Sequence, residues 1–319
     1  MNLSATQIPQ YCELFGRWQV RTIHGQQVLY TTNLGSYLRF RVLKHAAITI
    51  NALNNGNPLA NPQVYAWRIA GRSWQRVAVD EMPLHIVVDH SVNVEIMTAG
   101  NNDIDQVWTG NQGFAITSMA ISGKITKAEP RQRLVAIGDS ITAGCWVAGK
   151  NSSFDYRPES NYLQLAADQC GFDVDRIAYS ASGVLAPGTG GVPSADKWID
   201  HIDRDNVWQA RPCQLVLVNL GTNDHQPDPA VFCQRFVALI KQIQKQWPAP
   251  VIVLTPISQR NASLIANAAR QTGCQLVSTQ GWCHHFTDHT HPNQAGSVEI
   301  AKHLVNVIQK MKGASTNGK

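Results

Sequence analysis

The sequence predicts an α/β protein in two parts, a β-sandwich or jelly roll over residues 1–128 and an α/β domain over residues 129–319. Two observations support this division. In the first part, short runs rich in β-branched and aromatic residues recur between turn signals, without helical periodicity. From Leu134 onward, apolar runs alternate with amphipathic helical patterns, which is typical of a parallel sheet covered by helices. The charged stretch around residues 128–131 separates the two parts.

Strands in the first part are predicted from alternation and from the breakers between them. In residues 37–42, the apolar residues Leu38, Phe40 and Val42 alternate with neighbours that include two arginines, as expected of a strand with one buried face. Turn signals at residues 54–58 and 100–103 interrupt the series. The predicted strands span residues 26–30, 36–42, 47–50, 64–69, 76–79, 85–88 and 93–97. Many short strands in succession favour a sandwich or jelly roll.

The second part alternates between strands and helices. The predicted strands span residues 134–137, 176–179, 214–220, 251–254 and 275–277. Residues 161–168 are predicted to open a helix, and the other predicted helices span residues 195–202, 232–246, 262–272 and 295–311. The strand at 214–220 is apolar on both faces, so we expect a parallel sheet with helices on each side.

Composition and charge argue against several classes of protein. The formal net charge is only +5 in 319 residues, and the basic residues do not gather in a pattern that would fit a nucleic acid. No apolar run approaches the length of a membrane span, and no signal peptide is visible at the N-terminus. Seven cysteines form an odd set without a CxxC pair. We therefore expect no nucleic-acid or membrane partner, and a reducing, cytoplasmic location.

The segment 135–144 suggests a nucleophilic serine. Its apolar run stops at Gly138, and Ser140 follows at the predicted end of the strand, before small residues that can enter a helix. The sheet would fix the serine backbone there, and nearby amides could receive a developing oxyanion. A Gly-Asp-Ser triplet alone is more typical of an ordinary strand-to-helix turn. The interpretation therefore depends on the segments that follow.

Three further polar segments, 180–183, 221–224 and 288–293, follow predicted strands or precede the last helix. In a doubly wound sheet, ligands bind beyond the carboxyl ends of the strands. These segments and Ser140 are therefore expected at one edge of the sheet. Their coincidence in this order weighs more than any one of them alone.

Within these segments, His291 is the candidate base for Ser140, and Asp288 is placed three residues earlier to orient the His291 ring through Nδ1. Gly183 can offer a backbone N–H to an oxyanion, and the Asn223 side-chain amide can offer another. Simpler roles remain open. Gly183 could be a loop glycine, Asn223 a turn former, Asp288 the cap of a short turn and His291 a surface histidine.

A histidine-rich segment, residues 284–291, raises the question of zinc. It holds four histidines, but no cysteine or histidine pair elsewhere in the sequence completes a recognisable ligand spacing. We therefore expect neither a metal nor another cofactor.

The ordered set of Gly138-Asp139-Ser140, Gly183, Gly221-Thr222-Asn223-Asp224 and Asp288-x-x-His291-Pro292-Asn293 resembles the SGNH hydrolases, also called GDSL-type esterases. The resemblance spans about residues 134–312. It implies a flavodoxin-like α/β/α fold and metal-free ester hydrolysis through an acyl-enzyme. It also implies a triad of Ser140, Asp288 and His291, with an oxyanion hole from Ser140, Gly183 and Asn223. One departure is His289, because glycine commonly follows the acid in the family.

A β-sandwich directly before such a domain is similar to the architecture of carbohydrate esterase family 2, whose members remove acetyl groups from sugars. That resemblance suggests Trp108, Trp146 and Trp282 as candidates for a wall on which a sugar stacks. Packing in the core or between the domains is an equally good interpretation of these tryptophans. Asp139 and His289, beside the proposed catalytic groups, are further candidates for substrate contact.

Together these observations predict a serine esterase that hydrolyses small acyl esters, most of all O-acetyl groups on carbohydrates, with an acetylated oligosaccharide as the expected substrate. An acyltransferase, or a lipid or thioester hydrolase, could use the same site. A protein that mainly binds carbohydrate through its β domain is the alternative outside enzymes. The sequence identifies neither the sugar nor the position of its acetyl group. It is compatible with a homo-oligomer without fixing the oligomeric state.

Overall fold

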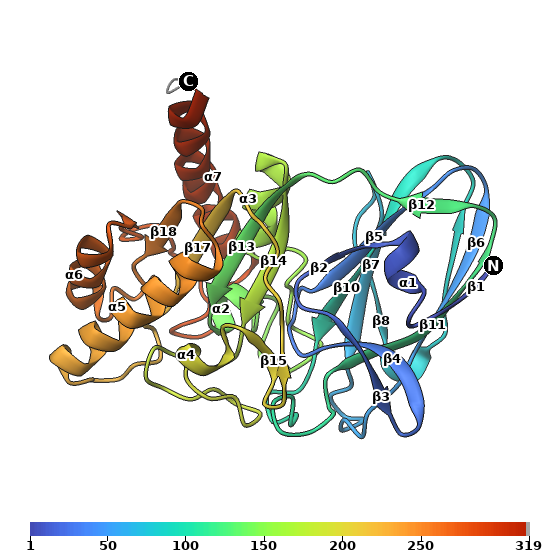
Figure 1. Ribbon diagram of the computed structural model, residues 1–319, viewed down its shortest axis with the longest axis horizontal. Coiled ribbons are helices and arrows are strands. Elements are labelled where there is room, and N and C mark those ends of the chain that lie inside the picture. The colour runs from blue at the N-terminus through green and yellow to red at the C-terminus, as the bar shows by residue number, and fades with distance from the viewer. Residues whose placement is uncertain (317–319) are drawn as a thin grey trace.

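The chain begins with a sandwich of two antiparallel sheets in the computed structural model, which describes residues 1–316 (Figure 1). One sheet has the order β3-β4-β11-β6-β9, with β1 paired to β11: β1 (Asn2–Ser4), β3 (Gln19–Ile23), β4 (Gln26–Thr31), β6 (Ala46–Ala52), β9 (Leu84–Val88) and β11 (Phe114–Ser122). The other has the order β12-β5-β10-β7-β8, with β2 paired to β5: β2 (Glu13–Phe15), β5 (Tyr37–Val42), β7 (Val64–Ile69), β8 (Gln75–Ala78), β10 (Val92–Gly100) and β12 (Ile125–Lys127). A short helix, α1 (Ile8–Tyr11), and a 3-10 turn, η1 (Val79–Glu81), complete this part.

The alternation in β5 explains how this sandwich is held together. Leu38, Phe40 and Val42 are buried in the core between the sheets, where Ile48 and Met119 of the opposite sheet belong to the same cluster. Burial of such side chains is the main stabilising term for a sandwich. The predicted β architecture is confirmed.

The strand β11 was not predicted from the sequence, although it lies between β4 and β6 in its sheet. Phe114 and Ile116 alternate correctly, but the register shifts between Ile116 and Ser118, and the next buried side chains are Met119 and Ile121. A β-bulge adds one residue to a strand and so moves the alternation out of phase. The period of two is therefore broken in the middle of this strand.

The second part is a five-stranded, all-parallel sheet with the order β14-β13-β17-β18-β19, covered by helices on both faces (Figure 1). The strands are β13 (Gln132–Gly138), β14 (Phe172–Ala178), β17 (Leu215–Asn219), β18 (Val251–Leu254) and β19 (Gln275–Val277). The helices are α2 (Ser140–Ala143), α3 (Tyr162–Cys170), α4 (Ala195–Trp198), α5 (Pro229–Gln246), α6 (Ala262–Thr272) and α7 (Gln294–Thr316). The α/β fold class expected from the sequence is confirmed.

Alternate residues of the strands pack against different helices. Val135 and Val216 belong to a cluster with buried residues of α5 and α6, whereas Leu134 and Leu217 belong to one with α3 and α7. Because both faces of the sheet are buried, β18 is apolar throughout, and β17 is apolar up to its last residue, Asn219. The rigid sheet that results positions the loops at its carboxyl edge.

The helix predicted at 195–202 ends early, at Trp198, and a short hairpin of β15 (His201–Asp203) and β16 (Asn206–Val207) follows. The reason lies outside the local sequence. Arg17, a fully buried residue of the β domain, donates hydrogen bonds to the carbonyl oxygens of Trp198 and His201. These carbonyl groups are thereby bonded across the domain boundary instead of along a helix.

The two domains share their cores. The connection between β12 and β13 is short, and Tyr30 and Trp108 of the β domain belong to the same buried cluster as Tyr179 and Trp198 of the α/β domain. Arg17 also donates to the Tyr179 hydroxyl (2.6 Å). A buried boundary of this kind resembles a domain interior more than a loose inter-domain contact.

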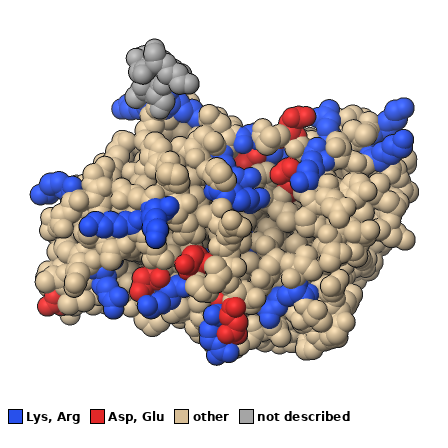
Figure 2. Space-filling view, viewed as in Figure 1, with Lys and Arg blue, Asp and Glu red and all other residues tan. Residues whose placement is uncertain are grey.

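No helix among residues 1–316 is both long and apolar enough to cross a membrane. On the face drawn in Figure 2, the lysines and arginines are spread out, and several of them lie beside acidic side chains. This face shows no continuous basic surface of the kind that binds a nucleic acid.

Candidate active site

The structure brings Ser140, His291 and Asp288 together at the carboxyl edge of the parallel sheet. Ser140 begins α2 directly after β13, and His291 and Asp288 lie in the loop before α7. The distance from Ser140 Oγ to His291 Nε2 is 2.8 Å, and that from His291 Nδ1 to Asp288 Oδ2 is also 2.8 Å. The hydrogen-bond network assigns the ring proton to Nδ1, which leaves Nε2 free to accept from the serine hydroxyl.

Asp288 is held in its charged form. Its Oδ1 accepts hydrogen bonds from the backbone N–H groups of Thr290 (2.8 Å) and His291 (2.7 Å). Partial burial acts to raise the pKa of Asp288, but these bonds and the His291 ring lower it to about 2. Asp288 is therefore ionised at neutral pH and can stabilise a protonated His291.

The turn that carries Ser140 requires small and polar residues. A Cβ atom on Gly138 would lie 2.2 Å from Thr142 Oγ1, so no larger residue fits there. Asp139 caps α2 by accepting from the Ile141 N–H (3.0 Å). Asp139 is fully buried, and burial raises its pKa to about 7, against the lowering effect of that bond. It therefore has no exposed surface for the substrate contact expected from the sequence.

The three expected oxyanion donors differ in their present hydrogen bonds. The Ser140 N–H is the first of α2 and has no partner inside that helix. The Asn223 amide donates one hydrogen to the Ser182 carbonyl (3.0 Å), which leaves its second hydrogen for a ligand. The Gly183 N–H, in contrast, donates to the Ala186 carbonyl (2.9 Å). Donation from Gly183 to an oxyanion would require this bond to be shared or exchanged.

Asp224, for which no role was predicted from the sequence, supports the loop after Gly183. Its carboxylate accepts from three successive backbone N–H groups, those of Val184 (2.9 Å), Leu185 (2.7 Å) and Ala186 (3.0 Å). The carboxylate also lies where a Cβ atom on Gly183 would be, at 2.6 Å. The segment Gly221-Thr222-Asn223-Asp224 is a visible signal in the sequence, although only Asn223 in it was predicted to have a role.

Of the three candidate tryptophans, all within the described residues, only Trp146 has a ring contact with His291. The two ring centroids are 6.3 Å apart with an interplanar angle of 60°. Trp146 is half-buried and has a φ of 61°. For a bulky side chain, this left-handed conformation is strained.

The other candidates lie elsewhere. Trp108 is buried between the domains, with its ring at 6.1 Å from that of Tyr179. Trp282 is buried and stacks on His303 of α7 at 5.1 Å. Trp108 and Trp282 therefore pack within the protein and do not form a wall on which a sugar could stack. His289 is exposed in the loop between Asp288 and His291.

The described part of the chain holds no group of three or more His, Cys, Asp or Glu residues arranged to bind a metal ion. Two of the clustered histidines, His284 and His285, instead lie near Glu299, at 3.6 and 3.0 Å.

Comparison with known families and structures identifies the class of protein. The model of the GDSL-like lipase/acylhydrolase family matches residues 136–297, which include Ser140, Gly183, Asn223, Asp288 and His291. No curated protein matches the sequence significantly. The fold and this match define a carboxylic ester hydrolase. Within that class, the chain belongs to the GDSL-like lipase/acylhydrolase family.

Solved structures share this two-domain fold along nearly the whole chain. A family two carbohydrate esterase from Cellvibrio japonicus matches with a TM-score of 0.77 and 16% identity, over 97% of each chain. The acetyl xylan esterase Est2A from Butyrivibrio proteoclasticus matches with a TM-score of 0.77 and 14% identity, over 98% of this chain and 99% of that one. The salicylyl-acyltransferase SsfX3 from a tetracycline biosynthetic pathway matches with a TM-score of 0.64 and 15% identity, over 95% of each chain. At these identities, the likeness shows the fold.

Proposed function

We propose that this protein removes acetyl groups from acetylated carbohydrates through an acyl-enzyme formed on Ser140. The observation that carries the proposal is the continuous hydrogen-bonded line from Ser140 Oγ through His291 to Asp288, with both distances at 2.8 Å. The same arrangement serves as nucleophile, base and orienting acid in serine hydrolases on unrelated folds.

In the first half of the reaction, Ser140 Oγ attacks the acetyl carbonyl carbon while His291 Nε2 takes the hydroxyl proton. The ionised Asp288 stabilises the charged ring. The negative charge on the carbonyl oxygen is received by the Ser140 N–H and by the free hydrogen of the Asn223 amide. Gly183 joins them once its bond to Ala186 is exchanged. Each such donor is worth about 3–4 kcal/mol of transition-state stabilisation.

The tetrahedral intermediate then collapses. His291 gives its proton to the departing sugar oxygen, and the acetyl group remains on Ser140 as an ester. In the second half, His291 takes a proton from water, which attacks the acyl carbon. The proton returns to Ser140 and acetate leaves. No step needs a metal ion or a cofactor.

Two features support a small acyl group on a sugar. The fold is shared along its full length with an enzyme described as an acetyl xylan esterase. The Trp146 ring, beside His291, also offers an apolar face of the kind on which a sugar ring can pack. A sugar hydroxyl in place of water would turn hydrolysis into acyl transfer, which makes transfer the principal alternative.

The first experiment is hydrolysis of 4-nitrophenyl acetate, butyrate and octanoate by the wild type and Ser140→Ala, each with EDTA. We expect EDTA-resistant activity that prefers acetate and is lost in Ser140→Ala. Full activity in the variant would refute the role of Ser140, and a preference for octanoate would favour a lipase. Acetylated xylo-oligosaccharides, followed by acetate release with and without an acceptor sugar, then separate hydrolysis from transfer.

A further inference from the structure

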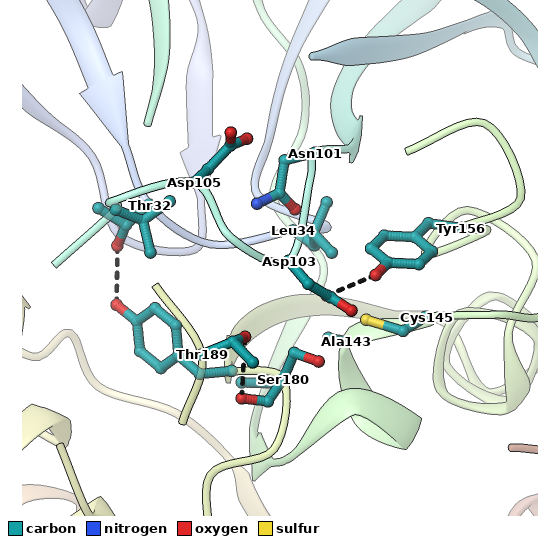
Figure 3. Close-up of a pocket in the computed structure, with 13 residues that line it drawn as sticks. Thr32, Leu34, Asn101, Asp103, Asp105, Ala143, Cys145, Tyr156, Ser180 and Thr189 are labelled. Atoms are coloured by element: carbon teal, nitrogen blue, oxygen red, sulfur yellow. Dashed lines mark hydrogen bonds between the residues drawn. The ribbon is translucent and has the colours of Figure 1, made fainter. Parts of the chain in front are cut away.

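A small polar cavity lies where the β domain meets the α/β domain (Figure 3). It has a volume of about 30 Å³, and its lining comes from both domains. Asn101 and Asp103 enter it from the loop between β10 and β11, and Cys145, Tyr156 and Ser180 from the α/β domain. A cavity of this size holds water and not a sugar ring. Two of its lining residues, Tyr156 and Asp103, form a hydrogen bond between the two domains.

The Tyr156 hydroxyl donates a hydrogen bond to Asp103 Oδ1, which is drawn as a dashed line in Figure 3. Tyr156 is fully buried, while Asp103 is half-buried. A charged acceptor makes this a strong hydrogen bond that fixes the orientation of the ring. The β domain thereby determines where the Tyr156 ring lies.

The Tyr156 ring in turn supports Trp146. The two ring centroids are 5.0 Å apart at an interplanar angle of 81°, an edge-to-face contact. Trp146 is held at a φ of 61° although its side chain is bulky. A strained conformation of this kind persists only where the surroundings over-determine it.

Trp146 is also tied to the loop that carries the proposed base. The Thr287 hydroxyl donates to the Trp146 carbonyl (2.6 Å), and the Thr287 N–H donates to the His291 carbonyl (2.9 Å). With the ring contact to His291 at 6.3 Å, two routes lead from Trp146 to the imidazole, one through the backbone and one through the ring.

We propose that Asp103 is a positioning residue supplied by the β domain, which sets the place of His291 through Tyr156 and Trp146. This inference rests on the proposed function, because it requires His291 to act as the base. Without Asp103 as acceptor, Tyr156 turns, Trp146 relaxes from its strained conformation, and the His291 loop loses its support. The Ser140–His291 hydrogen bond is then populated for less of the time.

The test compares variants of the full chain on 4-nitrophenyl acetate. Asp103→Ala and Tyr156→Phe each break the same hydrogen bond, so each lowers kcat about tenfold with little change in KM, as small misplacements of a catalytic group do. The kcat of the double variant is no lower than that of either single variant, because both substitutions break the same hydrogen bond. Asp103→Asn keeps an acceptor oxygen for Tyr156 and retains kcat within about twofold. Asp89→Ala, an exposed acid of the same domain, is the matched control and is unchanged.

A spectroscopic readout separates positioning from general stability. The proton between His291 Nδ1 and Asp288 gives a low-field proton NMR signal, which broadens in Asp103→Ala and Tyr156→Phe but not in Asp103→Asn or Asp89→Ala. If Asp103→Ala does not fold, Tyr156→Phe carries the same expectation. Unchanged kcat in Tyr156→Phe, or a fall in Asp103→Asn equal to that in Asp103→Ala, overturns the inference. Activity that survives Ser140→Ala overturns the proposed function instead.

Discussion

Replacement of Asp224 by alanine tests whether the loop after Gly183 is held by one carboxylate. The variant removes the acceptor of three backbone N–H groups, at 2.9, 2.7 and 3.0 Å. Hydrogen bonds to a charged group contribute about 1.5–3 kcal/mol each. The N–H groups of Leu185 and Ala186 belong to half-buried residues that water can reach, whereas Val184 is buried. We therefore expect the free energy of unfolding to fall by about 2–4 kcal/mol, less than the sum of three full bonds.

The effect of Asp224→Ala on activity is larger than its effect on folding would suggest. Without the carboxylate, the turn that carries the Gly183 N–H is no longer fixed relative to Ser140. Loss of one oxyanion donor lowers kcat by about 10²–10³. The assay is kcat on 4-nitrophenyl acetate, measured where urea denaturation shows that the variant is still folded.

Asp228→Ala is the control for Asp224→Ala. Asp228 caps α5 by accepting from the Val231 N–H (2.9 Å), and it is exposed. Its loss costs about 1 kcal/mol of stability and leaves kcat unchanged. If Asp224→Ala also keeps kcat within about twofold of the wild type, the argument for the loop is wrong.

Three other substitutions give separate tests. Asp288→Asn keeps the size of the side chain but loses the charge that opposes the imidazolium, so kcat falls by about 10⁴; a fall below tenfold would favour a Ser140–His291 dyad. Asp139→Asn removes a carboxyl whose pKa is about 7 in the folded protein. The folded wild type keeps that proton to a higher pH than the unfolded chain, so its Tm relative to the variant falls between about pH 4 and pH 7; parallel Tm curves for the two proteins would contradict this. Arg17→Ala leaves the carbonyls of Trp198 and His201 without their donor, which costs about 1–3 kcal/mol for each unsatisfied acceptor. The free energy of unfolding, measured by urea denaturation, therefore falls by about 2–6 kcal/mol; a loss below about 1 kcal/mol would show that the domains do not depend on it.

The architecture was predictable because local patterns and tertiary packing agree. The apolar stretches that form β13, β17 and β18 are buried on both faces. The polar segments that follow β13, β14 and β17 meet at one edge, as expected for a parallel sheet. The prediction failed where tertiary contacts override local preference. The bulge in β11 conceals the alternation, and Arg17 ends α4 at Trp198 from a distance of 181 residues in the chain.

The site shows the same contrast. The segments that carry Ser140 and His291 have recognisable residues at recognisable spacings. The hydrogen bond from the Gly183 N–H to the Ala186 carbonyl depends on the conformation of a turn. No residue type in the segment determines that conformation. The support that Asp103 gives to Tyr156 depends on how two domains dock, and neither domain's sequence pattern contains that information.

The contact of Arg17 has a consequence for synthesis of the chain on the ribosome. Its guanidinium emerges early, but the Trp198 carbonyl that it binds is made 181 residues later, a delay of about 10–40 s at ordinary rates of elongation. Through that interval, the β domain carries a charged group whose final acceptors do not yet exist. Arg17 in the nascent sandwich therefore stays hydrated until the α/β domain has been synthesised. The esterase site is then the last part of the molecule to be completed, because His291 follows later still.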